Sequence, residues 1–138
     1  PLIWEDFIDL FKPSLDILSK KLNKRFDYTM YDPWLNLYNR NYYQEIHDHA
    51  GLDLSSVFFA NDGVDFGKFF FVDRNSCNFS EVYEDLISYS NHHQPTVKRG
   101  DIIFFSSHLL HGVSSHESDV TRKTLSVNFK LNKVNECN

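Results

Sequence analysis

The hydrophobic pattern divides the chain into two parts. In the first part, apolar residues recur at spacings of three, four or one, which predicts an amphipathic helix. This stripe consists of Leu2, Ile3, Phe7, Ile8, Phe11, Leu15, Leu18 and Leu22. Pro13 interrupts the stripe and lacks a backbone N–H, so we expect a break there and a second helix running from Pro13 toward Lys24. These helices form the N-terminal part, residues 1–26, and should pack as scaffold against the outside of a sheet.

From Asp27 onward, short segments rich in β-branched and aromatic residues take over. Residues 34–38 alternate, which places Trp34, Asn36 and Tyr38 on one face of a strand. Further strands are expected at 42–47, 54–60, 67–72, 101–107 and 124–131, with turns at 39–41 and 61–63. The pattern over residues 76–94 is ambiguous, since a helix over 80–88 and a strand over 86–97 both fit it. Many short strands after N-terminal helices predict a mainly β fold, a sandwich or jelly roll over residues 27–138.

Composition narrows the class of protein. With 138 residues the chain is long enough for one domain with a buried core. Its formal charge of −5 argues against a nucleic-acid partner, which usually requires a basic face.

No segment has the length and apolarity of a membrane span or the form of a signal peptide, so we expect a cytoplasmic protein without a membrane partner. Only Cys77 and Cys137 are present, which excludes a disulfide framework and a cysteine-rich zinc site. Pro1 is not a methionine, so residues before it are left open, as is the oligomeric state.

The sequence His47-Asp48-His49 is the first candidate for chemistry. Side chains at positions i and i+2 of an extended segment lie side by side, so the two imidazoles could grip one metal ion while Asp48 points away. Taken alone, two histidines at this spacing more often lie together by chance in a polar loop than bind a metal.

Two distant segments strengthen the metal interpretation. His111 follows the buried strand at 101–107, and Arg122 with Thr124 opens the last strand. A mononuclear iron site needs three protein ligands on one face with open positions left over. An arginine fork beside a hydroxyl suits a distal carboxylate. His47, His49 and His111 fit the first role, and Arg122 and Thr124 fit the second.

These motifs together resemble the Fe(II)/2-oxoglutarate-dependent oxygenases, most closely the 2OG-Fe(II) oxygenase group found in phages and marine bacteria. That group similarly shows W-x-N before an H-x-H, a strand like 54–59, a G-D-hydrophobic-F-x-S-x-L-x-H segment, and R-x-(S/T) with Asn six residues later. Here the corresponding residues are Trp34, Asn36, Gly100 to His111, Arg122, Thr124 and Asn128. The resemblance covers most of the chain from about Trp34 onward.

The resemblance implies a double-stranded β-helix, Fe(II) on His47 and His111, and the C5 carboxylate of 2-oxoglutarate on Arg122 and Thr124. The Asn36-x-Tyr38 pair stands at the same offset before the first ligand as the N-x-Y that holds 2-oxoglutarate in AlkB-type dealkylases. It also resembles the Y-x-x-G-x-x-x-x-x-H frame of prolyl 4-hydroxylases, with Asn41 in place of the glycine. Asn128 alternates onto the face of Arg122 and Thr124, which predicts a place near the metal.

One departure from the family pattern matters. The usual motif is H-x-D, whereas this chain has His49 at the position of the carboxylate. Three readings follow: a three-histidine iron site, an Asp48 that turns inward, or a two-histidine site with water as the third ligand. Imidazole also suits zinc and copper, so a three-histidine site would discriminate less well between metals.

The leading hypothesis is an oxygenase that hydroxylates an unidentified peptidyl or small-molecule substrate with Fe(II), O2 and 2-oxoglutarate. The alternatives are a catalytically silent jelly-roll module that binds a ligand or metal, and a cupin-type three-histidine dioxygenase. We expect the remaining histidines to lie outside the site: His92 and His93 on the surface, His108 behind the ligands or on the surface, and His116 in a solvated loop.

Overall fold

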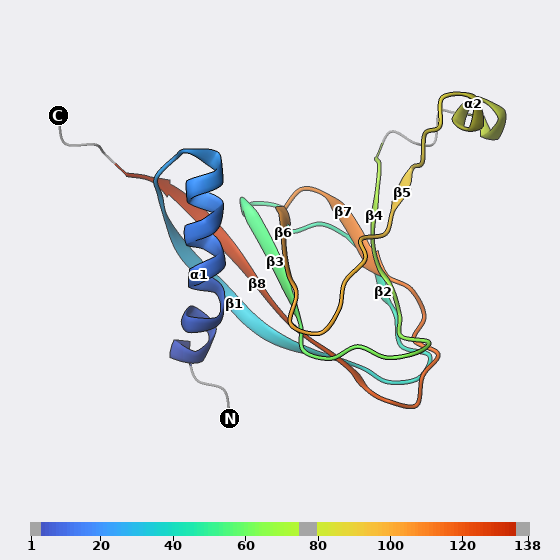
Figure 1. Cartoon of the computed structure of the whole chain (residues 1–138), viewed down its shortest axis with the longest axis horizontal. Coiled ribbons are helices and arrows are strands. Elements are labelled where there is room, and N and C mark those ends of the chain that lie inside the picture. Colours follow the sequence, from blue (N-terminus) through green and yellow to red (C-terminus); the bar gives the residue numbers. More distant parts are fainter. Residues whose placement is uncertain (1–3, 75–79, 135–138) are drawn as a thin grey trace.

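The computed structural model describes residues 4–74 and 80–134. Within these ranges the chain forms two antiparallel four-stranded sheets and two helices (Figure 1). The elements are α1 (Trp4–Leu22), β1 (Phe26–Tyr38), β2 (Gln44–His47), β3 (Leu54–Phe59), β4 (Phe69–Val72), α2 (Glu81–Leu86), β5 (His92–His93), β6 (Ile102–Ser106), β7 (Leu110–Val113) and β8 (Arg122–Lys133). The sheets form a jelly-roll-like sandwich, which confirms the predicted fold class.

The chain crosses repeatedly between the two sheets. The strand order is β1-β8-β3-β6 in one sheet and β2-β7-β4-β5 in the other. Since most consecutive strands lie in different sheets, strands far apart in sequence become neighbours. On β1 and β8, Asn36 pairs with Thr124 and Tyr38 pairs with Arg122. On β2 and β7, His47 pairs with His111. The register therefore gathers the candidate residues on the facing inner surfaces.

The helix α1 covers the outer face of the first sheet (Figure 1). Phe7, Phe11 and Leu15 are buried against the apolar face of β8, and the Phe11 ring lies 6.3 Å from that of Phe129. The predicted break at Pro13 is wrong, because α1 runs through it as one helix. Pro13 is exposed, while Phe11 and Leu15 on either side of it are fully buried, and this burial offsets the loss of one helical hydrogen bond.

Most of the predicted strands are present, although β1 starts earlier than expected, at Phe26. The pattern did not predict β7, a four-residue strand that contains His111 and Gly112. Between residues 80 and 97 the structure has the short helix α2 and only a two-residue strand, β5, so the helix prediction is confirmed and the long strand is wrong. Cys77 and Cys137 lie outside the described residues.

The expectation of a solvated His116 is wrong, since this side chain is fully buried. Its Nδ1 accepts a hydrogen bond from the Gly67 N–H at 3.2 Å, and its Nε2–H donates to the Val120 carbonyl at 2.8 Å. A neutral imidazole with its proton on Nε2 satisfies both bonds. His116 thus ties the loop before β8 to the segment before β4.

We expect His116→Ala to lower the free energy of unfolding by about 2–4 kcal/mol, because it leaves a cavity and removes the partners of the buried Gly67 N–H and of the Val120 carbonyl. Urea denaturation would measure this. His108→Ala is the matched control: His108 is exposed, and its loss should change stability by less than about 0.5 kcal/mol. Equal effects from the two substitutions would contradict a structural role for His116.

Candidate metal centre

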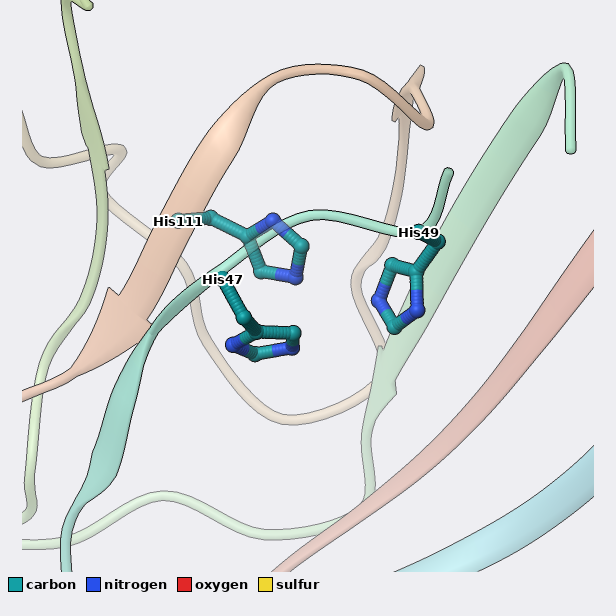
Figure 2. A group of neighbouring side chains, drawn as sticks. All are labelled: His47, His49 and His111. Carbon is teal, nitrogen blue, oxygen red and sulfur yellow. The ribbon is translucent and has the colours of Figure 1, made fainter. Parts of the chain in front are cut away.

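The three histidines of the sequence motif meet at one place. One ring nitrogen from each of His47, His49 and His111 lies within 4.8 Å of the others. The ring centroids are 4.3 Å apart for His47 and His111, 5.0 Å for His47 and His49, and 5.1 Å for His49 and His111. Figure 2 shows the rings turned toward one another, with His47 and His49 on one continuous segment and His111 on the neighbouring strand. This spacing suits one metal ion held by three imidazoles.

Backbone carbonyls orient two of the three rings. The Nδ1 of His47 lies 2.7 Å from the carbonyl of Glu45, and the Nδ1 of His111 lies 2.9 Å from that of Leu109. A carbonyl only accepts, so each Nδ1 carries a proton, and in the neutral ring Nε2 then keeps its lone pair for a metal. Gly112 permits the close pairing of β2 and β7, because a Cβ there would lie 2.9 Å from the carbonyl of Gln44.

Burial favours the neutral form of two of the three histidines, His49 and His111. The aromatic rings of Phe69 and Phe105 flank His111, and this burial lowers the pKa of His111 to about 4. Burial, and secondarily the charge of His47, also lowers the pKa of His49. At neutral pH these imidazoles are therefore in the neutral form that binds metals.

The same pKa shifts predict how the metal-free protein responds to pH. The pKa of His111 is lower in the folded than in the unfolded protein, so the unfolded chain binds more protons between pH 4 and about 6.5. Stability should be fully present above that window and should fall by up to about 3 kcal/mol as the pH drops through it. Urea denaturation at several pH values would measure the slope. His111→Leu should flatten it, and an unchanged slope would contradict the assignment.

Asp48 does not join the cluster. Its carboxylate forms an ion pair with Arg74, whose Nη2 also donates to the carbonyl of His108 at 3.1 Å. Arg74 follows β4, so this contact joins the segment of the H-x-H motif to the turn between β6 and β7. The geometry thus argues against the reading in which Asp48 turns inward.

Arg122 lies in the core between the two sheets. It is 3% exposed, and its guanidinium carbon lies 4.7 Å from the centre of the Tyr38 ring and 5.6 Å from that of Phe59. Burial lowers the pKa of Arg122 and raises that of Tyr38, whereas their mutual interaction opposes both shifts. The Nη1 of Arg122 is buried and has no hydrogen-bond partner among the described residues. A buried cationic donor without a partner is costly, which makes this position a candidate ligand site.

Asn36 belongs to a polar network rather than standing free. It accepts from the indole N–H of Trp34 at 3.0 Å and donates to Ser126 Oγ at 2.9 Å and Thr124 Oγ1 at 3.3 Å. Its amide is therefore engaged with protein groups and fixes the Thr124 hydroxyl beside Arg122. Thr124 is 2% exposed, so its hydroxyl faces the interior.

One pocket joins the metal cluster and the arginine. All eight candidate site residues line it: His47, His49, His111, Arg122, Thr124, Tyr38, Asn36 and Asn128. Sequence reasoning missed the lining serines Ser55 and Ser56, which lie inside an apolar strand and carry no motif, whereas alternation along the last strand already placed Ser126 on the face of Arg122 and Thr124. His92, His93 and His108 are exposed, as expected.

Comparison with known proteins agrees with this geometry. The sequence profile of the family described as "Putative 2OG-Fe(II) oxygenase" matches residues 32–128, more than two thirds of the chain. No curated protein matches significantly by sequence. These findings concern the family and give no support to the phage-like origin expected from the motifs.

Several solved structures share the fold. An oxidoreductase of the 2OG-Fe(II) oxygenase family from Burkholderia pseudomallei matches with a TM-score of 0.66 and 14% identity, over 83% of this chain and 50% of that one. A prolyl-4-hydroxylase from Pseudomonas putida matches with a TM-score of 0.59 and 15% identity, over 91% and 65% of the two chains. HygX from Streptomyces hygroscopicus, with nickel and 2-oxoglutarate bound, matches with 0.59 and 13%, over 84% and 60%. The chain thus spans about half to two thirds of these structures. In the described residues, no helix is long and apolar enough to cross a membrane.

Proposed function

We propose that this chain, which belongs to the 2OG-Fe(II) oxygenase family, is an oxygenase. It binds Fe(II) through His47, His49 and His111, and it binds 2-oxoglutarate through Arg122 and Thr124. With O2 it hydroxylates a peptidyl side chain or a small metabolite. The net charge of −5 supports these substrates over an anionic nucleic acid.

The buried guanidinium of Arg122, whose Nη1 has no hydrogen-bond partner among the described residues, is the observation on which this proposal rests. It shares one cavity with three imidazoles, and no described acidic residue forms an ion pair with it. A dicarboxylate that reaches from the metal to Arg122 would supply the missing acceptor and neutralise the buried charge. A cupin-type site, in which the substrate alone binds the metal, would need a substrate with its own carboxylate to pair with this arginine.

The residues present fit both the metal and the cosubstrate. Each of His47 and His111 offers a free Nε2, and their backbone partners hold the rings still. When bound, Fe(II) with 2-oxoglutarate supplies the activation of O2 for hydroxylation of a C–H bond. Arg122 and Thr124 bind and orient the distal carboxylate, while the rings of Tyr38 and Phe59 exclude water from the guanidinium.

Anaerobic titration tests the proposal. Fe(II) added to the protein with 2-oxoglutarate should give a visible metal-to-ligand charge-transfer band, because the 2-oxo group and the C1 carboxylate chelate the metal. Succinate, which lacks the 2-oxo group, is the matched control and should give no band. Metal binding without the band would overturn the proposal and favour the silent or cupin-like alternative.

A further inference from the structure

We propose that Asn128 is a positioning residue that selects the tautomer of His49 and thereby makes His49 the third metal ligand. The inference rests on the proposed metal site and deepens it. It concerns the one histidine of the cluster that stands where the family pattern has a carboxylate.

A buried polar chain leads from Asn128 to His49. The Nδ2 of Asn128 lies 3.5 Å from the Nδ1 of His49, and its Oδ1 accepts from Ser55 Oγ at 2.7 Å. Ser55 Oγ lies 2.8 Å from Ser107 Oγ. Asn128, Ser55 and Ser107 are 7%, 1% and 0% exposed, so water does not compete for the two bonds among these three residues.

His49 differs from the other two histidines in how its ring is held. A backbone carbonyl lies at the Nδ1 of His47 and of His111, whereas the amide of Asn128 lies at the Nδ1 of His49. The backbone N–H of His49 donates to the Ser107 carbonyl at 2.8 Å, which fixes the main chain but not the ring. The tautomer of His49 therefore depends on a side chain that can present either a donor or an acceptor.

Rotation of the Asn128 amide decides between the two tautomers. With Nδ2 toward His49, the ring must carry its proton on Nε2, which blocks that atom as a ligand. With Oδ1 toward His49, Nδ1 carries the proton, and Nε2 faces the metal with a free lone pair. Ser55 can donate to Oδ1 or accept from Nδ2, so the buried chain is satisfied in both orientations. Metal binding selects the second orientation.

The neutral amide also suits the charge of the site. Three imidazoles leave the full charge of a divalent metal, which the dianionic cosubstrate beside Arg122 offsets. Asn128 provides an acceptor for Nδ1–H without adding another negative charge.

Zn(II) titration, with a chelating dye as competitor, provides the test. Asn128→Leu removes the acceptor and should weaken Zn(II) binding by about 10- to 100-fold, the usual cost of losing a partner of a metal ligand. Asn128→Asp keeps an acceptor for both Ser55 and His49 and should restore binding to at least the wild-type level. In a His49→Ala background, Asn128→Leu should cause no further loss, because Asn128 acts through His49.

A spectroscopic readout separates this role from a structural one. In protein with 15N-labelled histidine, Zn(II) should move the His49 proton to Nδ1 in the wild type and in Asn128→Asp. This spectroscopic readout tests the inference even if Asn128→Leu does not fold. Any one of three results would overturn the inference. They are wild-type Zn(II) affinity in Asn128→Leu, an equal loss of affinity from Asn128→Leu in the His49→Ala background, and a proton on Nε2 of His49 in the zinc-loaded wild type.

The two proposals fail separately. If the wild type forms the charge-transfer band with 2-oxoglutarate but Asn128→Leu binds Zn(II) normally, this inference is wrong and the oxygenase proposal stands. If Zn(II) binds with the predicted dependence on Asn128 but 2-oxoglutarate gives no band, the oxygenase proposal is wrong and this inference stands.

Discussion

Arg122→Leu is expected to weaken 2-oxoglutarate binding by about two to three orders of magnitude while making the metal-free protein more stable. The loss follows because a buried charged hydrogen-bond partner is worth about 2–5 kcal/mol to its ligand. The gain follows because the unliganded protein no longer buries a cation whose Nη1 lacks a partner, which costs about 1–3 kcal/mol. Calorimetric titration with 2-oxoglutarate and urea denaturation would measure the two effects.

Lys123→Leu is the matched control for this prediction. Lys123 is the next residue on β8, but it is exposed on the opposite face, so its removal should change neither quantity appreciably. Arg122→Lys should bind 2-oxoglutarate with intermediate affinity, because an ammonium keeps the charge without the planar fork. Undiminished 2-oxoglutarate binding in Arg122→Leu would contradict the assigned role of the arginine.

His111→Ala should severely weaken metal binding at the site. His111 is 4% exposed and lies on β7, whereas His47 ends β2 and His49 follows two residues later on the same segment. Its removal leaves a pair of imidazoles on one segment, so the affinity for Fe(II) should fall by more than the roughly 100-fold that loss of a ligand's hydrogen-bond partner can cost. Competition with a chelating dye under anaerobic conditions would measure the Kd.

His108→Ala serves as the control for His111→Ala. His108 lies three residues earlier, is exposed, and contacts Ser106 Oγ at 2.8 Å rather than the cluster. The Fe(II) affinity of His108→Ala should match that of the wild type. An equal loss of affinity in both variants would mean that the β6–β7 turn was disturbed and that the ligand role of His111 is not demonstrated.

The grouping of the candidate residues on β1 and β8 could be predicted from the sequence because these residues obey strand alternation. Side chains at every second position share a face, which groups Asn36 with Tyr38 and Thr124 with Asn128. The register of β1 against β8 then places both pairs in one cavity. Alternation within a strand is a local property, so it can be read from the sequence without knowledge of the fold.

The features that sequence reasoning missed depend on contacts between distant segments. The Pro13 rule failed because burial of Phe11 and Leu15 outweighs one lost hydrogen bond. His116 looked solvated beside charged neighbours, yet it bonds to Gly67 across the fold. Likewise, nothing near Asp48 in the sequence indicates that Arg74 holds its carboxylate.

X-ray absorption of the anaerobic Fe(II) complex with 2-oxoglutarate tests the central claim most directly. If His47, His49 and His111 share the metal, the spectrum should fit three imidazole ligands together with a chelating 2-oxoglutarate, and His49→Ala should lower the imidazole count to two. A wild-type spectrum with two imidazoles and a protein carboxylate, or one that 2-oxoglutarate leaves unchanged, would contradict the account.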